Sequence, residues 1–225
     1  MLKFTLIDYP GKVAAVIFTQ GCNYRCPFCH NPALVLPELF TPSIPMEEVL
    51  SFLDLRRGQL QGVVITGGEP TLQPDLKEFI RLIKAKGFLV KLDTNGSRHV
   101  VLEEILSEKL VDFVAMDIKS SLQGYCKASG VAADIKSVQA SIAAIKASGV
   151  DYVFRTTAVK GLVSPEDLKE IGGLLDKPLR YKLQRGNLSA KVLDPDILDG
   201  PYDFSEQEWD AMTRMHAGIE RIKQD

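Results

Sequence analysis

Runs with the character of buried strands alternate with helical patterns along most of this 225-residue chain, and this alternation constrains the fold more than any other feature. Six runs have the character of buried parallel strands, the first of them rich in Val and Ile: Lys12–Thr19, Gly62–Thr66, Leu89–Asp93, Val111–Lys119, Tyr152–Thr157 and Leu179–Gln184. Helical patterns follow them over Pro45–Arg57, Pro74–Lys86, Val100–Glu108, Ile135–Ser148, Pro165–Leu175 and Ser205–Lys223. Strands that alternate with helices imply right-handed crossovers and a parallel sheet.

Six such units are too few for an eight-unit barrel, which takes about 250 residues. The predicted fold is therefore α/β, a partial, open (β/α)6 TIM-like barrel with parallel strands. A doubly wound flat sheet is the alternative. We expect residues 1–184 to form the partial barrel and residues 185–225 to form a C-terminal extension with a helix packed on it.

Composition excludes several classes of protein. Lys plus Arg number 27 and Asp plus Glu 29, so the net charge is −2 and no basic excess exists to neutralise nucleic-acid phosphates. The apolar run Val13–Phe18 is far shorter than the ~20 residues that span a bilayer. The N-terminus lacks the apolar core of a signal peptide. We therefore expect a cytoplasmic protein that binds neither nucleic acid nor membrane.

Each predicted strand runs into a polar or glycine-rich cluster. Active sites of parallel α/β proteins form at the carboxyl ends of their strands, so these clusters predict one shared ligand site. The alternative is that loops after strands are polar in any protein. The clusters are Thr19–Cys22, Thr66–Pro70, Asp93–Gly96, Asp117–Lys119, Arg155–Thr157 and Gln184–Arg185.

Three of the four cysteines fall within eight residues in the pattern C-x3-C-x2-C: Cys22, Cys26 and Cys29. Thiolates are the usual ligands of iron–sulfur centres, and a [4Fe-4S] cluster normally takes four, so three leave one iron open to another ligand. A structural zinc site with His30 as fourth ligand is the alternative, although the neighbours Cys29 and His30 could hardly both reach one tetrahedral ion. Cys126 stands apart; it could be a fourth ligand or a radical relay, but we expect it to be packed.

The cysteine motif, with Phe28 as its aromatic residue, resembles the signature of the radical S-adenosylmethionine (radical SAM) superfamily. His30-Asn31-Pro32 follows it as in the glycyl-radical-enzyme activases. Gly67-Gly68-Glu69-Pro70 is similar to the superfamily's GGE motif. The activases' DTNG and D-x-K segments resemble Asp93-Thr94-Asn95-Gly96 and Asp117-Ile118-Lys119. The anaerobic ribonucleoside-triphosphate reductase activating proteins are most similar, through Ile7–Lys12, Thr66–Leu76, Met116–Lys119 and Phe154–Thr157.

The resemblance implies a radical SAM fold and one [4Fe-4S] cluster, bound by Cys22, Cys26 and Cys29, whose open iron binds S-adenosylmethionine (SAM). Reductive cleavage of SAM would yield a 5′-deoxyadenosyl radical that abstracts a hydrogen from a glycine of a partner glycyl radical enzyme. We expect that partner to be anaerobic ribonucleoside-triphosphate reductase and the electron donor to be a flavodoxin or a ferredoxin-type protein. The alternatives are a radical SAM enzyme acting on a small molecule such as a deazapurine precursor, and a structural zinc-binding module.

The resemblance also implies roles for single residues around SAM. Gly67 and Gly68 would let the backbone approach the methionine end of SAM, and Glu69 would pair with its ammonium group. Asp117 and Lys119 would meet the ribose and the carboxylate. The remaining implied ligand residues are Phe28, His30, Asp93, Asn95, Arg155 and Gln184.

The resemblance implies a second role for two of these residues, and three of them have a structural alternative to ligand binding. Asp93 and Asp117 could hold a monovalent cation near the SAM carboxylate, as in related activases. Asp93 and Asn95 could instead simply form a turn, because DTNG is typical turn chemistry. Arg155 could equally form a structural ion pair.

Overall fold

The structure is a computed structural model that describes residues 1–175, 180–186, 192–194, 196, 203–214 and 220–221. The chain divides into two compact units, and each is described by itself. The first comprises Met1–Asn23, Ala33–Ala115 and Ser137–Tyr152, and the second comprises Tyr24–Pro32, Met116–Lys136 and Val153–Asp225.

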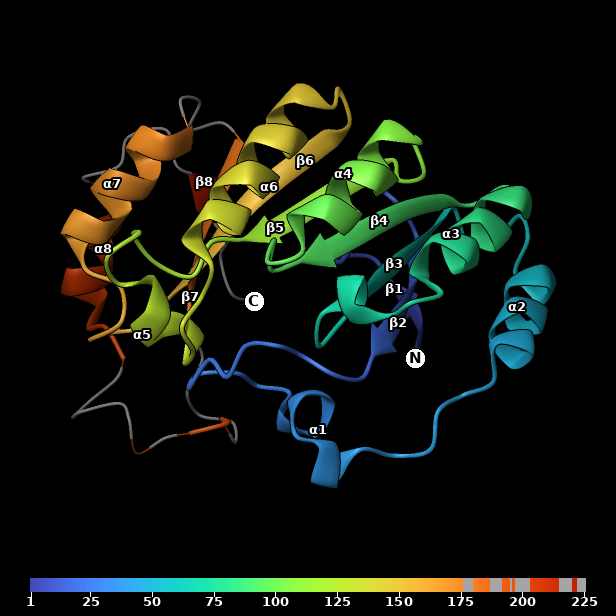
Figure 1. Cartoon of the computed structure of the whole chain (residues 1–225), viewed down its shortest axis with the longest axis horizontal. Coiled ribbons are helices and arrows are strands. Elements are labelled where there is room, and N and C mark those ends of the chain that lie inside the picture. The colour runs from blue at the N-terminus through green and yellow to red at the C-terminus, as the bar shows by residue number, and fades with distance from the viewer. Residues whose placement is uncertain (176–179, 187–191, 195, 197–202, 215–219, 222–225) are drawn as a thin grey trace. The chain divides into compact units, whose positions relative to one another are not determined.

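The first unit contains the strands β1 (Leu2–Thr5), β2 (Ala14–Thr19), β3 (Gly62–Gly67) and β4 (Leu89–Thr94), which pair in chain order (Figure 1). β1 is antiparallel to β2, whereas β2, β3 and β4 are parallel. Val16 pairs with Val64, and Val64 pairs with Lys91, so these three side chains share one face of the sheet. On this face Val16 and Val64 form a buried cluster with Tyr9 and Ala14.

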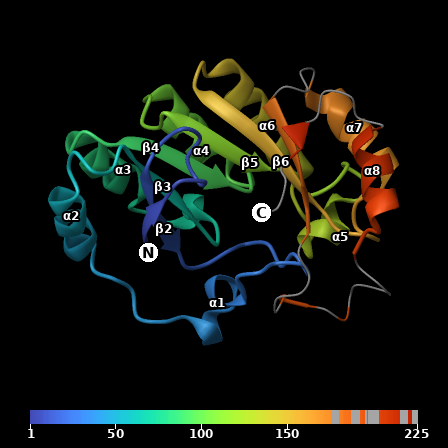
Figure 2. The ribbon, with the colours of Figure 1, turned by 180° about the vertical axis from the view of Figure 1, so that it is seen from behind.

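The first unit also contains the helices α1 (Pro32–Val35), α2 (Met46–Leu55), α3 (Leu76–Ala85), α4 (His99–Ser107) and α6 (Ile135–Ala147), with short 3-10 turns η1 (Pro37–Leu39) and η2 (Pro70–Leu72). Figures 1 and 2 show α3 beside β3 and β4. Ile80 and Ile83 recur at helical spacing on α3 and are fully buried, so this face of α3 belongs to the core. Gly87, with φ +88°, follows α3 and ends it in the left-handed conformation that glycine adopts without strain.

The second unit contains β6 (Asp151–Ala158), β7 (Tyr181–Arg185) and β8 (Glu220–Arg221), which are parallel. β5 (Phe113–Asp117) and β6 cross the boundary between the units. The helices of the second unit are α5 (Tyr125–Ser129), α7 (Pro165–Leu175) and α8 (Glu206–Arg214). α8 starts with a capping box, in which the Ser205 amide donates to Glu208 Oε2 (2.8 Å) and the Glu208 amide donates to Ser205 Oγ (3.2 Å).

The predicted fold is confirmed. The predicted parallel strands are β2 to β7, and the predicted helices are α2, α3, α4, α6, α7 and α8. The strands follow one another in the sheet in chain order, as in an open parallel barrel, rather than in the reversed order of a doubly wound sheet.

Three details differ from the sequence prediction. The patterns predict neither β1 nor β8. The last helix was predicted to reach Lys223 but ends at Arg214, and Glu220–Arg221 is a strand because it pairs with Lys182 and Leu183 of β7. Residues 179, 215–219 and 222–223 of the predicted elements lie outside the described residues, and the domain boundary after residue 184 stays a prediction. None of the helices in the described ranges has the length and apolar character of a membrane span.

Candidate functional site

Gly67 at the end of β3 and Gly68 directly after it lie against the backbone that leads into the cysteine motif. Gly67 has a φ of +126°, and a Cβ there would lie 2.3 Å from the Thr19 nitrogen. A Cβ on Gly68 would lie 2.0 Å from the Gly21 carbonyl oxygen. The Gly68 and Glu69 amides donate to the carbonyls of Thr19 (2.9 Å) and Gly21 (2.7 Å). The family resemblance implies that these glycines let the backbone approach a ligand. In the structure they let it approach the chain's own backbone at Thr19 and Gly21.

Glu69 has no exposed surface. Its Oε1 accepts hydrogen bonds from the Thr71 amide (3.1 Å) and from the hydroxyls of Thr71 and Thr94, and its Oε2 accepts one from the Asn95 amide (2.7 Å). Burial raises the pKa of Glu69, while these hydrogen bonds oppose the rise. The carboxylate therefore joins the loops that follow β3 and β4, and its partners are protein groups. Pairing of Glu69 with a ligand ammonium stays a prediction.

Asn95 extends this network to the cysteine motif. Its Nδ2 donates to Asn23 Oδ1 (3.0 Å) and lies 4.0 Å from Cys22 Sγ. Its Oδ1 accepts from the Ser97 amide (2.9 Å), while Asn23 Nδ2 donates to Ser97 Oγ (2.8 Å). Asn95 therefore forms the predicted turn and also supports the first residues of the cysteine motif.

The rest of the cysteine motif is anchored in the second unit. The Arg25 amide donates to the Ser129 carbonyl (2.8 Å) at the end of α5. Gly130, with φ +69°, lets the chain pass so close that a Cβ there would lie 2.0 Å from the Arg25 carbonyl oxygen. The carbonyl of Cys29 accepts from the Leu193 amide (3.0 Å). Backbone hydrogen bonds thus fix this part of the loop.

The donor set of the motif suits an iron–sulfur cluster. Cys22 and Cys29 are half-buried, Cys26 is buried, and none of them forms a disulfide. Within the described ranges, no three His, Cys, Asp or Glu side chains gather where they could hold a single metal ion. A [4Fe-4S] cube binds each thiolate at a different iron atom, so it requires three thiols on one loop rather than three ligands at one point. These residues fit that requirement.

Three further residues that the sequence singles out, Phe28, His30 and Cys126, differ in their exposure. Phe28 is buried and His30 is exposed. Cys126 is exposed, so the expectation that it is packed was wrong. The reason is the short helix α5, which buries Tyr125 and Ala128 and leaves Cys126 on its outer side.

The second unit brings together three predicted residues, Asp117, Lys119 and Arg155. Arg155 Nε donates to Asp117 Oδ1 (2.8 Å), and Lys119 Nζ donates to Asp117 Oδ2 (3.1 Å). The side chains keep exposed fractions of 32% for Asp117 and 21% for Arg155. Burial alone would raise the pKa of Asp117, but the charges of Arg155 and Lys119 and their hydrogen bonds hold it well below its usual range. The cluster thus combines one carboxylate with two basic side chains, whose charges suit an anionic ligand group.

Gln184 lies on β7 beside this cluster. The register pairs Arg155 with Lys182 and Thr157 with Gln184, so these four side chains share one face of the sheet. The sequence analysis did not single out Lys182. The alternation of side chains along Leu179–Gln184 is the signal that could have identified it, because Lys182 and Gln184 are two residues apart.

Lys91 is a second residue that the sequence analysis missed. Its Nζ forms an ion pair with Asp93 Oδ1, and the exposed fractions of the two side chains are 4% and 13%. A lysine in the middle of the apolar run Leu89–Asp93 is the signal that could have identified it. Asp93 is thus placed against a cation of its own strand.

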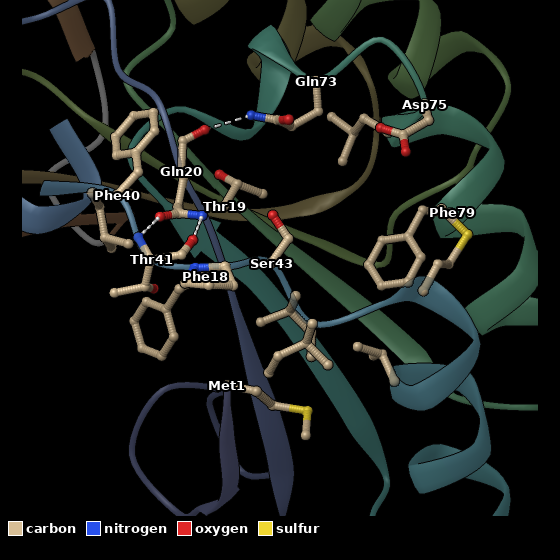
Figure 3. A pocket seen from close by; sticks show the side chains of 17 residues that line it. Met1, Phe18, Thr19, Gln20, Phe40, Thr41, Ser43, Gln73, Asp75 and Phe79 are labelled. Carbon is tan, nitrogen blue, oxygen red and sulfur yellow. Dashed lines mark hydrogen bonds between the residues drawn. The ribbon is translucent and has the colours of Figure 1, made fainter. Parts of the chain in front are cut away.

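A separate cavity of about 520 Å³ lies in the first unit (Figure 3). It is bounded by the end of β2, by residues 40–46 and by the start of α3, and Phe18, Phe40 and Phe79 line its apolar part. Gln20 Nε2 donates to the Thr41 carbonyl, and Gln20 Oε1 accepts from the Thr41 amide, both at 2.9 Å. None of the predicted site residues lines it, so it is distinct from the site built above.

Comparison with known proteins places these residues in context. The family model of the Radical SAM superfamily matches residues 16–175. A protein of Methanocaldococcus jannaschii that bears the name of a glycyl-radical enzyme activating enzyme is 36% identical over 190 residues, which cover 82% of this chain and 78% of that protein.

Two further relatives carry different names. The pyruvate formate-lyase-activating enzyme of Clostridium pasteurianum is 36% identical over 118 residues, or 51% of this chain and 48% of that enzyme. The match therefore spans about half the length of that enzyme. The 7-carboxy-7-deazaguanine synthase of Methanopyrus kandleri is 29% identical over 215 residues, or 76% of this chain and 84% of that enzyme.

A solved structure shares the fold. The crystal structure of Streptococcus suis SuiB bound to S-adenosylmethionine superposes with a TM-score of 0.67 at 15% identity. The match covers 94% of this chain and 50% of SuiB. At this identity the likeness shows the fold alone.

Proposed function

Because the chain belongs to the radical SAM superfamily of enzymes, we propose that it is a glycyl-radical-enzyme activase that binds a [4Fe-4S] cluster and SAM. The observation that carries the proposal is the cysteine motif: its first residues contact the Asn95 side chain in one unit, and the backbone of Arg25 is hydrogen-bonded to the end of α5 in the other. Its three thiols form no disulfide. The relative from M. jannaschii, similar over most of both chains, supports the activase assignment.

The residues of this chain would act by binding and orienting. Cys22, Cys26 and Cys29 would hold the cluster, which would supply the electron for reductive cleavage of SAM to methionine and a 5′-deoxyadenosyl radical. Arg155 and Lys119 are basic side chains that would suit the carboxylate of the methionine end.

Other predicted ligand residues would complete the site around SAM. Gln184 and Asp117 would contact the ribose or adenine. Phe28 and His30 would flank the cluster, and Gly67 and Gly68 would offer backbone groups near the methionine end. Glu69 and Asn95 would act mainly by holding the loops that carry these groups, because protein donors already surround Glu69.

The partner that would lose a glycine hydrogen is, by the motifs of this sequence, anaerobic ribonucleoside-triphosphate reductase. A flavodoxin or a ferredoxin-type protein would deliver the electron. Cysteines without a disulfide and an oxygen-sensitive cluster suit a reducing compartment, so the cytoplasm is the proposed location.

A small-molecule enzyme is the second candidate. The match to the M. kandleri deazaguanine synthase covers 84% of that enzyme, which keeps a heterocyclic substrate in consideration. Such an enzyme would act on a free heterocycle and would need no partner protein.

Electron paramagnetic resonance with candidate partners separates the two. The reconstituted chain, reduced and supplied with SAM, is incubated with anaerobic ribonucleoside-triphosphate reductase or with pyruvate formate-lyase. We expect a SAM-dependent glycyl radical on the reductase. Cys126→Ser should retain the signal, whereas its matched counterpart Cys29→Ser should lose it. If neither partner gains a radical and a free heterocycle is converted instead, the activase assignment is wrong.

A further inference from the structure

Lys91 is a buried lysine on the face of β4 that also carries Asp93. Residues two apart on a strand share a face, and Lys91 is paired in register with the buried Val64. Leu89, on the same face, packs against the apolar cluster of Tyr9, Ala14, Val16 and Val64. The lysine stem therefore starts in an apolar layer, and its ammonium ends at the Asp93 carboxylate.

A buried ammonium group is costly unless an opposite charge compensates it. The exposed fraction of the Lys91 side chain is only 4%, so water does not supply that compensation. The Asp93 carboxylate does, and it receives a full positive charge in return. The Lys91 ammonium group thus places a compact positive charge against a carboxylate oxygen of Asp93, as a bound monovalent cation would.

The second carboxylate that the resemblance assigns to a monovalent cation is also compensated. Asp117 accepts from both Arg155 and Lys119, so its own unit surrounds it with two positive charges. Both carboxylate oxygens of Asp117 are thus already bound by basic groups, and a further cation there would meet their like charges. Asp93 and Asp117 thus do not fit the monovalent cation that the family resemblance implies.

We propose that the ammonium group of Lys91 is the cation beside Asp93 in this protein, so that SAM binds without an added monovalent cation. The inference rests on the proposed function, because it concerns the same SAM site. Lys91 acts through Asp93 and is a positioning residue: it orients the Asp93 carboxylate and compensates its charge when SAM enters.

The test is a calorimetric titration of the anaerobically reconstituted protein with SAM in potassium chloride, in sodium chloride and in choline chloride at one ionic strength. Choline is too bulky to replace a small cation at a carboxylate. We expect the dissociation constant of the wild-type protein to agree within about twofold in the three salts. A wild-type constant that is several-fold weaker in choline than in potassium would overturn the inference.

Lys91→Met sharpens the test, because it keeps the apolar stem and removes the charge. We expect this variant to bind SAM at least about tenfold more weakly in choline than in potassium. The thermal unfolding midpoint of its holo-protein without SAM should also rise when potassium replaces choline. Lys84→Met is the matched control, since Lys84 pairs with Asp112 in the same unit (2.7 Å) outside the site, and it should show neither dependence.

The outcomes distinguish this inference from the proposed function. If Lys91→Met is less stable in every salt but shows no cation dependence of SAM binding, Lys91 is a structural ion-pair residue only and the inference is wrong. If Lys91→Met does not fold, the wild-type titration in three salts still decides. If the wild-type protein binds no SAM in any salt, the proposed function itself fails.

Discussion

The ends of β3 and β4 in the first unit and the ends of β5 and β6 in the second carry the same kind of motif residue but use it differently. In the first unit, the Glu69 carboxylate is fully buried and receives four protein hydrogen bonds. In the second, the Asp117 carboxylate and its partners Lys119 and Arg155 stay partly exposed. Glu69, whose carboxylate has its hydrogen-bond partners within the protein, holds the loops together. The partly exposed charged groups around Asp117 remain accessible to a ligand.

This difference assigns different tasks to motifs that look equivalent in the sequence. Gly67, Gly68 and Glu69 pack the loop after β3 onto Thr19 and Gly21, directly before the first cysteine. Damage there should lower stability first. Arg155 and Asp117 form a charged cluster whose loss should lower SAM affinity first. Variants in the two regions should therefore separate stability from binding.

Gly68→Ala should have the largest effect. The added Cβ would lie 2.0 Å from the Gly21 carbonyl oxygen and 2.9 Å from that of Leu34, and these are backbone atoms that cannot rotate away. We expect a loss of more than about 4 kcal/mol in the free energy of unfolding, measured by denaturant titration. Gly173→Ala in α7, where nothing lies within 4 Å, is the control and should gain about 0.5–1 kcal/mol. Equal stability of the two variants would contradict the packing role of Gly68.

Glu69→Gln should rank second. Four donors point at the carboxylate, and an amide offers one acceptor oxygen and an unwanted donor in its place. Stability should fall by about 2–4 kcal/mol, whereas Glu170→Gln on the exposed side of α7 should change it by less than about 0.5 kcal/mol. A stable Glu69→Gln protein that fails to bind SAM would move Glu69 from the structural region to the ligand site.

Arg155→Met should affect binding more than folding. Removing one of the two cations at Asp117 should weaken SAM binding about tenfold, or about 1.4 kcal/mol, in a calorimetric titration. Lys119 still neutralises Asp117, so the free energy of unfolding should fall by only about 1 kcal/mol. Arg81→Met, which removes an exposed pair with Glu108, serves as the control and should leave SAM affinity unchanged. If Arg155→Met binds SAM as the wild type does, the charged cluster is structural.

The pH dependence should give the smallest effect. The pKa of Asp117 is lower in the folded protein than in the unfolded chain, so its ion pairs contribute stability above its unfolded value, about 3.9. That contribution is lost as the pH falls from there toward the folded value. The stability difference between wild type and Asp117→Asn should therefore narrow below about pH 4 in denaturant titrations. A difference that stays constant from pH 6 to pH 3 would argue against the ion pairs.

Most of the fold follows from local pattern. The six predicted strands coincide with β2 to β7, and the helices keep the period that buries residues such as Ile80 and Ile83. β1 and β8 escape prediction because each is short and exists only through pairing with a neighbouring strand, which no local pattern encodes. The exposure of Cys126 likewise depends on which side of α5 faces the core.

Sequence motifs indicate candidate site residues but not what each of them contacts. The motifs name Glu69, Asn95, Asp117 and Arg155, yet only the three-dimensional partners show which of them are already satisfied. Lys91 and Lys182 belong to no motif, and their relevance arises from the strand register and from the Asp93 ion pair.

The most direct test of the account is whether the cysteine motif supports SAM cleavage. The protein would be reconstituted with iron and sulfide under anaerobic conditions, reduced with dithionite and supplied with SAM, and 5′-deoxyadenosine would be measured together with the iron content. The account predicts about four irons per chain and SAM-dependent 5′-deoxyadenosine. One tightly bound zinc, no iron and no 5′-deoxyadenosine would contradict it and leave a structural metal domain.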